Sequence, residues 1–128
     1  MKLLLDTHTF LWFIDGSSNL SQTARQLIEN EDNQRFVSIA SLWEIAIKVS
    51  IGKLKLGVSL PDLVKQQVYD NDIELLAISP EHLDILRKLD FHHKDPFDRL
   101  IISQSIVEKM TIITKDTAFI SYSVQILW

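Results

Sequence analysis

The sequence contains no cysteine, and no apolar run in it approaches the roughly 20 residues that span a bilayer. Without cysteine the chain can form no disulfide scaffold, zinc knuckle or thiol nucleophile, so that carboxylates and four histidines remain as metal ligands. The apolar run at the N-terminus is interrupted by Asp6 and His8 before it reaches the length of a signal-peptide core. We therefore expect a cytoplasmic protein that does not enter a membrane.

Internal repeats, linkers and low-complexity stretches are also missing from the 128 residues, of which 46% are hydrophobic. A chain of this length can bury one core but is too short for two, so we expect a single domain over residues 1–128. The formal net charge of -4 argues mildly against a protein that coats nucleic acid. It does not exclude a nuclease, which can concentrate its negative charge where a metal ion binds.

Short apolar runs alternate with helix-like segments along the chain. The first run, residues 2–5, is continuously apolar, as is typical of a strand that is buried on both faces. Further strands are predicted at 36–38, 74–78, 110–114 and 124–127. Strands separated by helices favour right-handed crossovers and a mostly parallel sheet, with helices on both faces.

Capping residues and apolar periodicity predict the helices between these strands. The expected segments are 8–14, a helix capped by Ser21 that runs to Glu29, one ending near Gly52, one opened by Ser59 and Pro61, one from Ser79 to about Leu89, one begun by Asp95 and Pro96, and a short turn over 116–119.

Four acids, Asp6, Glu44, Asp98 and Asp116, lie where an apolar run gives way to a helix-like segment. In open α/β sheets such positions converge outside the carboxyl ends of the strands. Several carboxylates in one crevice repel one another and either retain protons or recruit a cation. Magnesium and manganese prefer oxygen ligands, so we expect a Mg²⁺ or Mn²⁺ site suited to phosphodiester hydrolysis.

Most of these acids also have a purely structural interpretation. Ser41 and Glu44 fit a capping box, Asp95 fits a helix cap before Pro96, and Asp116 fits the cap of a turn. Asp98 in a first helical turn is favoured by the helix dipole. Asp6 is harder to explain in this way, because an acid after a buried strand needs a partner to offset its desolvation.

Four segments that contain these acids resemble, in order, the four acidic motifs of PIN-domain proteins. They are Leu-Leu-Asp-Thr-His at 4–8, Ser-Ile-Ala-Ser-Leu-Trp-Glu-Ile at 38–45, His-Lys-Asp-Pro-Phe-Asp-Arg-Leu-Ile-Ile-Ser-Gln at 93–104, and Ile-Thr-Lys-Asp-Thr-Ala-Phe at 113–119. Within that family, the chain is similar to the VapC-like ribonuclease toxins of type II toxin-antitoxin systems that carry an Asp-Pro-Phe-Asp-Arg sequence.

The resemblance implies a three-layer α/β fold with a central, mostly parallel sheet of about five strands. It also implies RNA cleavage that leaves a 5′ phosphate and a 3′ hydroxyl, a small antitoxin as partner and a homodimer. Asp6, Glu44, Asp98 and Asp116 match the catalytic and metal-binding acids in order. Asp95 matches an additional acid of this branch and ranks below Asp98 as a metal ligand.

Other polar residues near the motifs are expected to be structural. His8, His92 and His93 could contact phosphate or carry protons, but we interpret them as surface or core residues, because a single histidine is more often one of these. Arg99 could reach a phosphate, but an ion pair with Asp95 is the favoured interpretation.

Two classes of function other than a toxin nuclease stay open. A non-catalytic module that binds RNA or protein could keep the acids without turnover, and a housekeeping nuclease that processes RNA would have the same motifs. A phosphotransfer receiver is excluded because Asp6 has no adjacent acid, and a haloacid-dehalogenase-type phosphatase is excluded because His8 stands where it requires a second aspartate.

Overall fold

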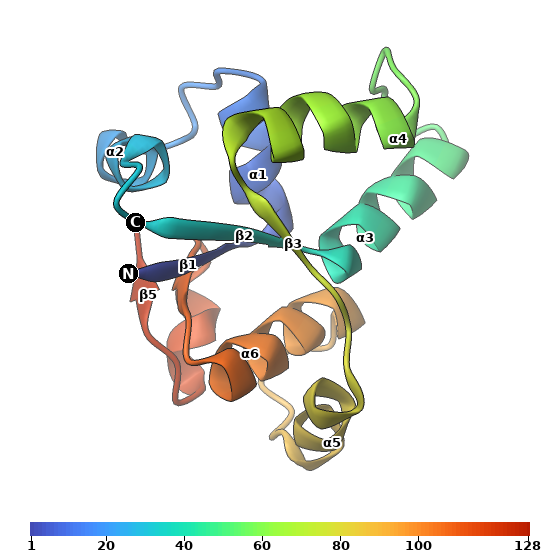
Figure 1. Cartoon of the computed structure of the whole chain (residues 1–128). Coiled ribbons are helices and arrows are strands. Elements are labelled where there is room, and N and C mark those ends of the chain that lie inside the picture. Colours follow the sequence, from blue (N-terminus) through green and yellow to red (C-terminus); the bar gives the residue numbers. More distant parts are fainter.

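A computed structural model describes residues 1–128 and contains one five-stranded sheet (Figure 1). All neighbouring strands are parallel, and their order across the sheet is β3-β2-β1-β4-β5. The predicted five-strand sheet is thus confirmed, and it is parallel throughout. The strands are β1 (Lys2–Leu5), β2 (Gln34–Ser38), β3 (Glu74–Leu76), β4 (Thr111–Ile113) and β5 (Ile126–Leu127).

The last three strands are shorter than predicted and β2 is longer, because Gln34 and Arg35 also pair with β1, while β3 joins β2 from Phe36 onward. Most helices lie close to their predicted positions. They are α1 (Thr7–Ile14), α2 (Gln22–Glu29), α3 (Ile39–Ser50), α4 (Leu60–Leu63), α5 (Pro80–Lys88) and α6 (Pro96–Glu108), with a 3₁₀ helix at Thr117–Ser121.

The segment after Pro61 differs from the helix that was expected there. Only α4 is α-helical, and it continues into a π-helical turn, Val64–Val68, and a 3₁₀ turn, Tyr69–Asn71. A π-helical turn is wider than an α-helical one. It therefore lets Leu63 and Val68, which are five residues apart, enter the same hydrophobic core.

The molecule has three layers, because alternate side chains of the strands point to opposite faces of the sheet. Leu3 and Leu5 pack with residues of α1, α2 and α4 on one face, and Leu4 packs with residues of α6 on the other. Figure 1 shows α1, α2 and α4 on one side of the sheet and α5 and α6 on the other. No helix is long and apolar enough to cross a membrane.

Strand order determines where a ligand can bind. The chain leaves the central strand β1 toward β2 and β3 on one side, and it later returns to place β4 and β5 on the other side. The order therefore reverses between β1 and β4, and the crevice at such a point opens beyond the carboxyl ends of the strands. Asp6 follows β1 directly, and Thr114 follows β4.

Candidate active site

Asp6 is the most deeply buried acid of the crevice, with 5% of its surface exposed. One carboxylate oxygen accepts a hydrogen bond from the backbone N–H of Thr9 at 2.8 Å, so that Asp6 caps α1. The other oxygen accepts a hydrogen bond from the Thr114 hydroxyl at 2.6 Å. These two donors offset the desolvation of the carboxylate and fix its direction.

Thr114 connects Asp6 to the fourth acid. Its hydroxyl oxygen accepts a hydrogen bond from the backbone N–H of Asp116 at 3.0 Å, while its O–H donates to Asp6. Asp116 in turn caps the 3₁₀ helix through Ala118 N–H at 2.9 Å. The predicted capping role of Asp116 is therefore confirmed. Its second carboxylate oxygen is directed elsewhere, toward His93.

Glu44 lies on α3 and is 6% exposed. The predicted capping box with Ser41 is wrong: α3 begins one turn earlier and is capped by Ser38, while the Ser41 hydroxyl accepts a hydrogen bond from the Thr7 hydroxyl at 2.9 Å. Glu44 instead forms an ion pair with Lys48, one turn further along, at 2.9 Å. Its carboxylate is thereby free of helix capping.

Asp98 lies in the first turn of α6, which Asp95 caps through the backbone N–H groups of Phe97 and Asp98. Burial raises the pKa of Asp98 from 3.8 to about 7, together with the negative charges of four nearby carboxylates, in decreasing order Asp95, Asp6, Glu44 and Asp116. No hydrogen-bond donor or cation of the chain compensates this carboxylate. The other four acids predicted from the sequence thus all raise the pKa of the Asp98 carboxyl group.

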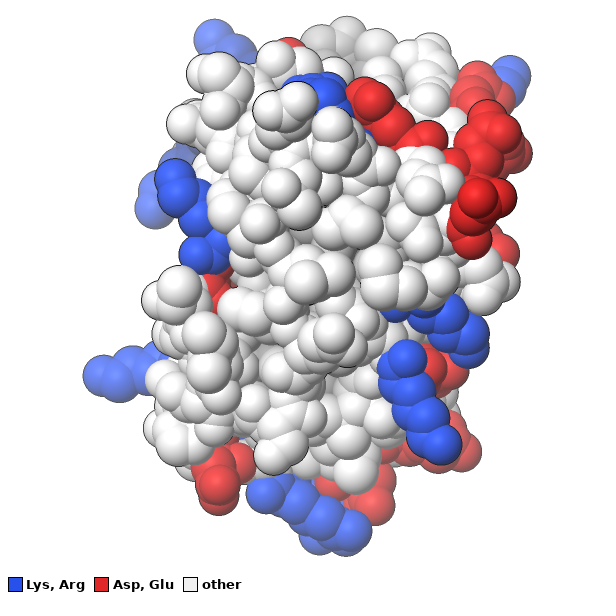
Figure 2. Space-filling model, turned by 90° about the vertical axis from the view of Figure 1, so that its left-hand side faces the viewer, with Lys and Arg blue, Asp and Glu red and all other residues white.

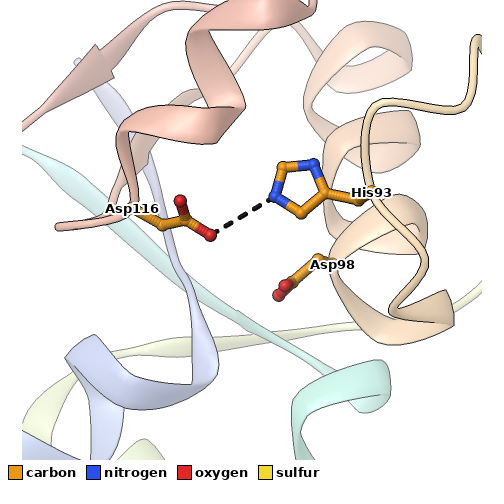
Figure 3. Close-up of side chains that lie close together, drawn as sticks. All are labelled: His93, Asp98 and Asp116. Carbon is orange, nitrogen blue, oxygen red and sulfur yellow. Dashed lines mark hydrogen bonds and ion pairs between the residues drawn. The ribbon is translucent and has the colours of Figure 1, made fainter.

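His93, the first residue of the third motif segment, lies beside these acids as well. Its Nε2 atom lies 3.3 Å from a carboxylate oxygen of Asp116, and the side chain is 9% exposed. Single ligand atoms of His93, Asp98 and Asp116 all lie within 4.8 Å of one another (Figure 3). His93 is packed as expected of a core residue, but its ring nitrogen also faces the acids, whereas His8 and His92 are exposed.

The loop before α6 explains how His93 reaches the acids. The backbone N–H groups of His92 and His93 both donate to the hydroxyl of Tyr122, at 3.0 and 2.8 Å. The His93 ring stacks on Tyr122 and meets Phe119 edge-on, with ring centroids 5.5 and 4.9 Å apart. Both aromatic partners follow β4, so the C-terminal segment fixes the position of the histidine.

Arg99 does not form the predicted ion pair with Asp95. Its guanidinium group donates to the carbonyl oxygens of Leu86, Leu89 and Asp90, and it lies 4.0 Å from the ring centroid of Phe91. Asp95 is instead engaged as the cap of α6, where its side chain accepts hydrogen bonds from the backbone N–H groups of Phe97 and Asp98. Arg99 holds the loop between α5 and α6 and leaves the acids without its charge.

The donor set fits a hard divalent cation. Carboxylate oxygens are the ligands that Mg²⁺ and Mn²⁺ prefer, and an imidazole nitrogen is compatible with Mn²⁺. The raised pKa of Asp98 indicates that its carboxyl group lacks a compensating positive charge. The fold and the site thus define an α/β protein with an acidic crevice at the switch point of a parallel sheet, suited to a cation.

The sequence matches the family model of the PIN domain over residues 3–124, and the chain therefore belongs to the PIN-domain family. PIN domains are nucleases. No curated protein matches the chain by sequence.

Solved structures with the same fold include chains of two toxin-antitoxin systems. One belongs to VapBC2 from Rickettsia felis bound to a DNA fragment from its promoter, with a TM-score of 0.73, 18% identity and coverage of 100% of this chain and 99% of that chain. Another belongs to FitAB bound to an IR36 DNA fragment, with a TM-score of 0.67, 16% identity and coverage of 98% and 93%. A chain of FitAcB from Neisseria gonorrhoeae has a TM-score of 0.67 and 15% identity, with coverage of 98% of this chain and 96% of that chain. At these identities the likeness concerns the fold.

Proposed function

We propose that this protein is a divalent-metal-dependent endoribonuclease and the toxin of a type II toxin-antitoxin pair. The observation that carries the proposal is the environment of Asp98, a carboxyl group surrounded by four other acids and compensated by no cation of the chain. Such an arrangement costs free energy in the isolated fold, and a bound cation would recover it. Membership of a nuclease family supports the same reading.

The side chains would divide the work. Asp6, Glu44, Asp98 and Asp116 would hold the ion, and Asp95 would act mainly as the cap that orients the first turn of α6. Thr114 would keep Asp6 and Asp116 in register through its two hydrogen bonds. His93 would orient Asp116.

A bound Mg²⁺ or Mn²⁺ ion would supply Lewis acidity, which makes water a better nucleophile and stabilises negative charge on a phosphodiester. The chain itself places the carboxylates, excludes water from the base of the crevice with the core residues beneath Asp6, and keeps Lys48 paired with Glu44. The acids are thereby prepared for the cation before it binds.

The nuclease is tested by cleavage of single-stranded and structured RNA with Mg²⁺, with Mn²⁺, and with excess chelator. We expect cleavage only with an ion, and its loss in Asp98→Asn. The matched control is Asp32→Asn, an exposed acid in the loop before β2. Full activity in chelator or in Asp98→Asn contradicts the proposal, and RNA binding without cleavage by the wild-type protein would indicate a non-catalytic module.

The antitoxin is supported by apolar side chains that no other part of the chain covers. Ile47, Val49, Ile51 and Val58, on α3 and the loop after it, are each about 40% or more exposed. Ile47 and Ile51 line one surface hollow and Val49 and Val58 line another, and exposed apolar patches mark protein interaction sites. Relief of growth arrest by the product of a neighbouring reading frame, and a stable complex of the two proteins, would separate a toxin from a housekeeping nuclease. The expected homodimer is tested by light scattering of the purified chain.

A further inference from the structure

A hollow of about 320 Å³ opens directly from the acids of the candidate site. It is lined by Asp6, His8, Trp12, Lys115 and Asp116, of which only Trp12 is apolar. Asp6 and Asp116 belong to the acid cluster, so that a group bound in this hollow would touch the atoms next to the reacting phosphate. The proposed function uses neither Trp12 nor Lys115.

The Trp12 ring is held in place before any ligand arrives. It lies on α1, half-buried, and Trp128 packs against it edge-on with ring centroids 5.9 Å apart. His8, one turn earlier on the same helix, lies 5.7 Å away on a tilted plane. A ring that is already fixed loses little conformational freedom when a flat group stacks on it. Tryptophan is well suited to binding a planar, partly polar ligand.

Lys115 gives this hollow its positive charge. Its Nζ atom lies 5.9 Å from the centroid of the Trp12 ring, and the residue stands between Thr114 and Asp116 in the segment after β4. A phosphate that approached Asp6 and Asp116 would meet two negative charges, which Lys115 can partly offset. An aromatic face beside a cation is the pattern by which proteins bind the bases and backbone of single-stranded nucleic acids.

The hollow on the opposite side of the acids has a different character. It measures about 430 Å³ and contains Lys48, Lys53 and Lys94 beside Glu44 and Asp95. Lys48 is paired with Glu44 at 2.9 Å, so Lys53 and Lys94 are the cations that suit a phosphate backbone, and they carry no preference for a base. The first hollow thus combines one tryptophan with one lysine, whereas the second combines lysines with the apolar side chains of Ile47, Ile51 and Phe97.

We propose that the Trp12 hollow binds one unpaired nucleobase of an RNA strand, next to the phosphate held at the acids, and that the backbone continues toward Lys53 and Lys94. This inference rests on the proposed ribonuclease function and adds that the substrate is single-stranded at the cut. A base within a duplex is already stacked on its neighbours and presents only its edges. It would have to leave the stack to reach the tryptophan.

The face of the molecule drawn in Figure 2 is the side of α2 and the N-terminus, at the amino ends of the strands and away from the acids. It shows Lys and Arg side chains scattered singly among acids around a broad uncharged area, with no continuous basic patch. A protein that follows a duplex over its length needs many cations on one face. A single strand that enters the two hollows needs only the few lysines named above.

The test measures whether Trp12 and one particular base act together. A fluorescently labelled short RNA and a set of copies, each with one abasic position moved along the strand, are bound to the Asp98→Asn protein with Mg²⁺. We expect Trp12→Leu, which keeps an apolar side chain against Trp128, to weaken binding of the intact RNA about tenfold. It should have no further effect on the copy whose abasic position falls in the hollow. Trp12→Phe should restore most of the affinity.

Trp43→Ala is the matched control, because Trp43 is 54% exposed and packs on Phe97, outside the Trp12 hollow. We expect its effect to be the same on every RNA of the set. If Trp12→Leu lowered the affinity by the same factor for every RNA of the set, its effect and that of each abasic position would simply multiply. That result would overturn the inference. Unchanged RNA binding by Trp12→Leu would also overturn the inference. That result is expected if the hollow instead receives a side chain of a partner protein.

Cleavage is measured on the same RNAs with the Asp98 side chain intact, so that the two proposals can fail separately. Cleavage without coupling between Trp12 and a base would contradict the base site and leave the ribonuclease in place. Coupling in binding without cleavage would support the base site and contradict the ribonuclease. No binding of any RNA would contradict both.

Discussion

The two sides of the acidic crevice stabilise a carboxyl group in different ways. On the side of β1 and β4, both oxygens of Asp6 accept hydrogen bonds, from Thr9 and from Thr114. On the side of α6, the Asp98 carboxylate has no donor, and its pKa rises to about 7. The first acid is stabilised by the fold, whereas the second is stabilised only by a proton or a cation. One half of the site is therefore formed by the fold alone, whereas the other half depends on its ligand.

The largest expected effects come from replacing the two acids themselves, with RNA cleavage and the free energy of unfolding measured on the same variants. Asp6→Asn and Asp98→Asn should each reduce RNA cleavage by at least about a hundredfold, because each removes a negative charge that would hold the metal ion. Only Asp6→Asn should also lower the free energy of unfolding, since its amide N–H₂ would face a donor. Cleavage rates and urea denaturation in chelator measure the two effects, with Asp32→Asn as control. Equal stability losses in both variants would contradict the comparison.

A pH dependence of stability follows from Asp98 alone. Its pKa is about 7 in the folded protein and 3.8 in the unfolded chain, so the folded state binds more protons between these two values. Stability contributed by this proton is fully present at low pH and is lost as the pH rises toward 7. In chelator, the wild-type protein should therefore lose stability between about pH 4 and about pH 7 relative to Asp98→Asn.

The measurement is the difference between urea midpoints of the two proteins at each pH, because other titrating groups, such as the His82–Glu108 pair, are common to both. Addition of Mg²⁺ or Mn²⁺ should stabilise the wild-type protein most at high pH, where the cation need not displace the proton. A difference that stays constant with pH would show that Asp98 is ionised throughout.

On the Asp6 side, the donor can be removed while the acid stays. Thr114→Val keeps the shape of the side chain but leaves one buried oxygen of Asp6 without its 2.6 Å hydrogen bond, which should cost about 1–3 kcal/mol. Thr111→Val is the matched control, because the Thr111 hydroxyl donates to Gln125 at 3.2 Å in a partly exposed position. Denaturant unfolding measures both. A smaller loss for Thr114→Val than for Thr111→Val would contradict the supporting role of Thr114.

The sequence allowed the Asp6 side to be predicted more fully than the Asp98 side. An acid directly after three buried leucines has few structural explanations, and the parallel sheet brings the ends of β1 and β4 together by topology. Helix caps at Ser21, Ser59, Ser79 and Asp95 were likewise readable from local patterns. These features depend on short-range chemistry or on the alternation of strands and helices.

The features that were missed depend on contacts between distant segments. His93 reaches the acids because Tyr122, nearly thirty residues later, accepts hydrogen bonds from the loop that carries it. Arg99 turns to three carbonyl oxygens whose positions are set by the end of α5 and the loop after it. Ser41 bonds Thr7 because α3 packs against α1. Two signals pointed to His93: it opens the third motif segment, and it stands two residues before the helix cap Asp95.

His93 therefore provides the finest test of how the unsupported side is held. His93→Phe keeps a ring against Phe119 and Tyr122 but removes the nitrogen that lies 3.3 Å from Asp116. Loss of a group that orients a metal ligand should weaken Mn²⁺ binding about tenfold. His93→Gln, whose amide can reach a similar point, should recover part of it. Calorimetric titration measures both, with His92→Phe as matched control, because His92 packs on Tyr122 without contacting an acid. Unchanged Mn²⁺ affinity in His93→Phe would mean that the ring serves only to pack the loop.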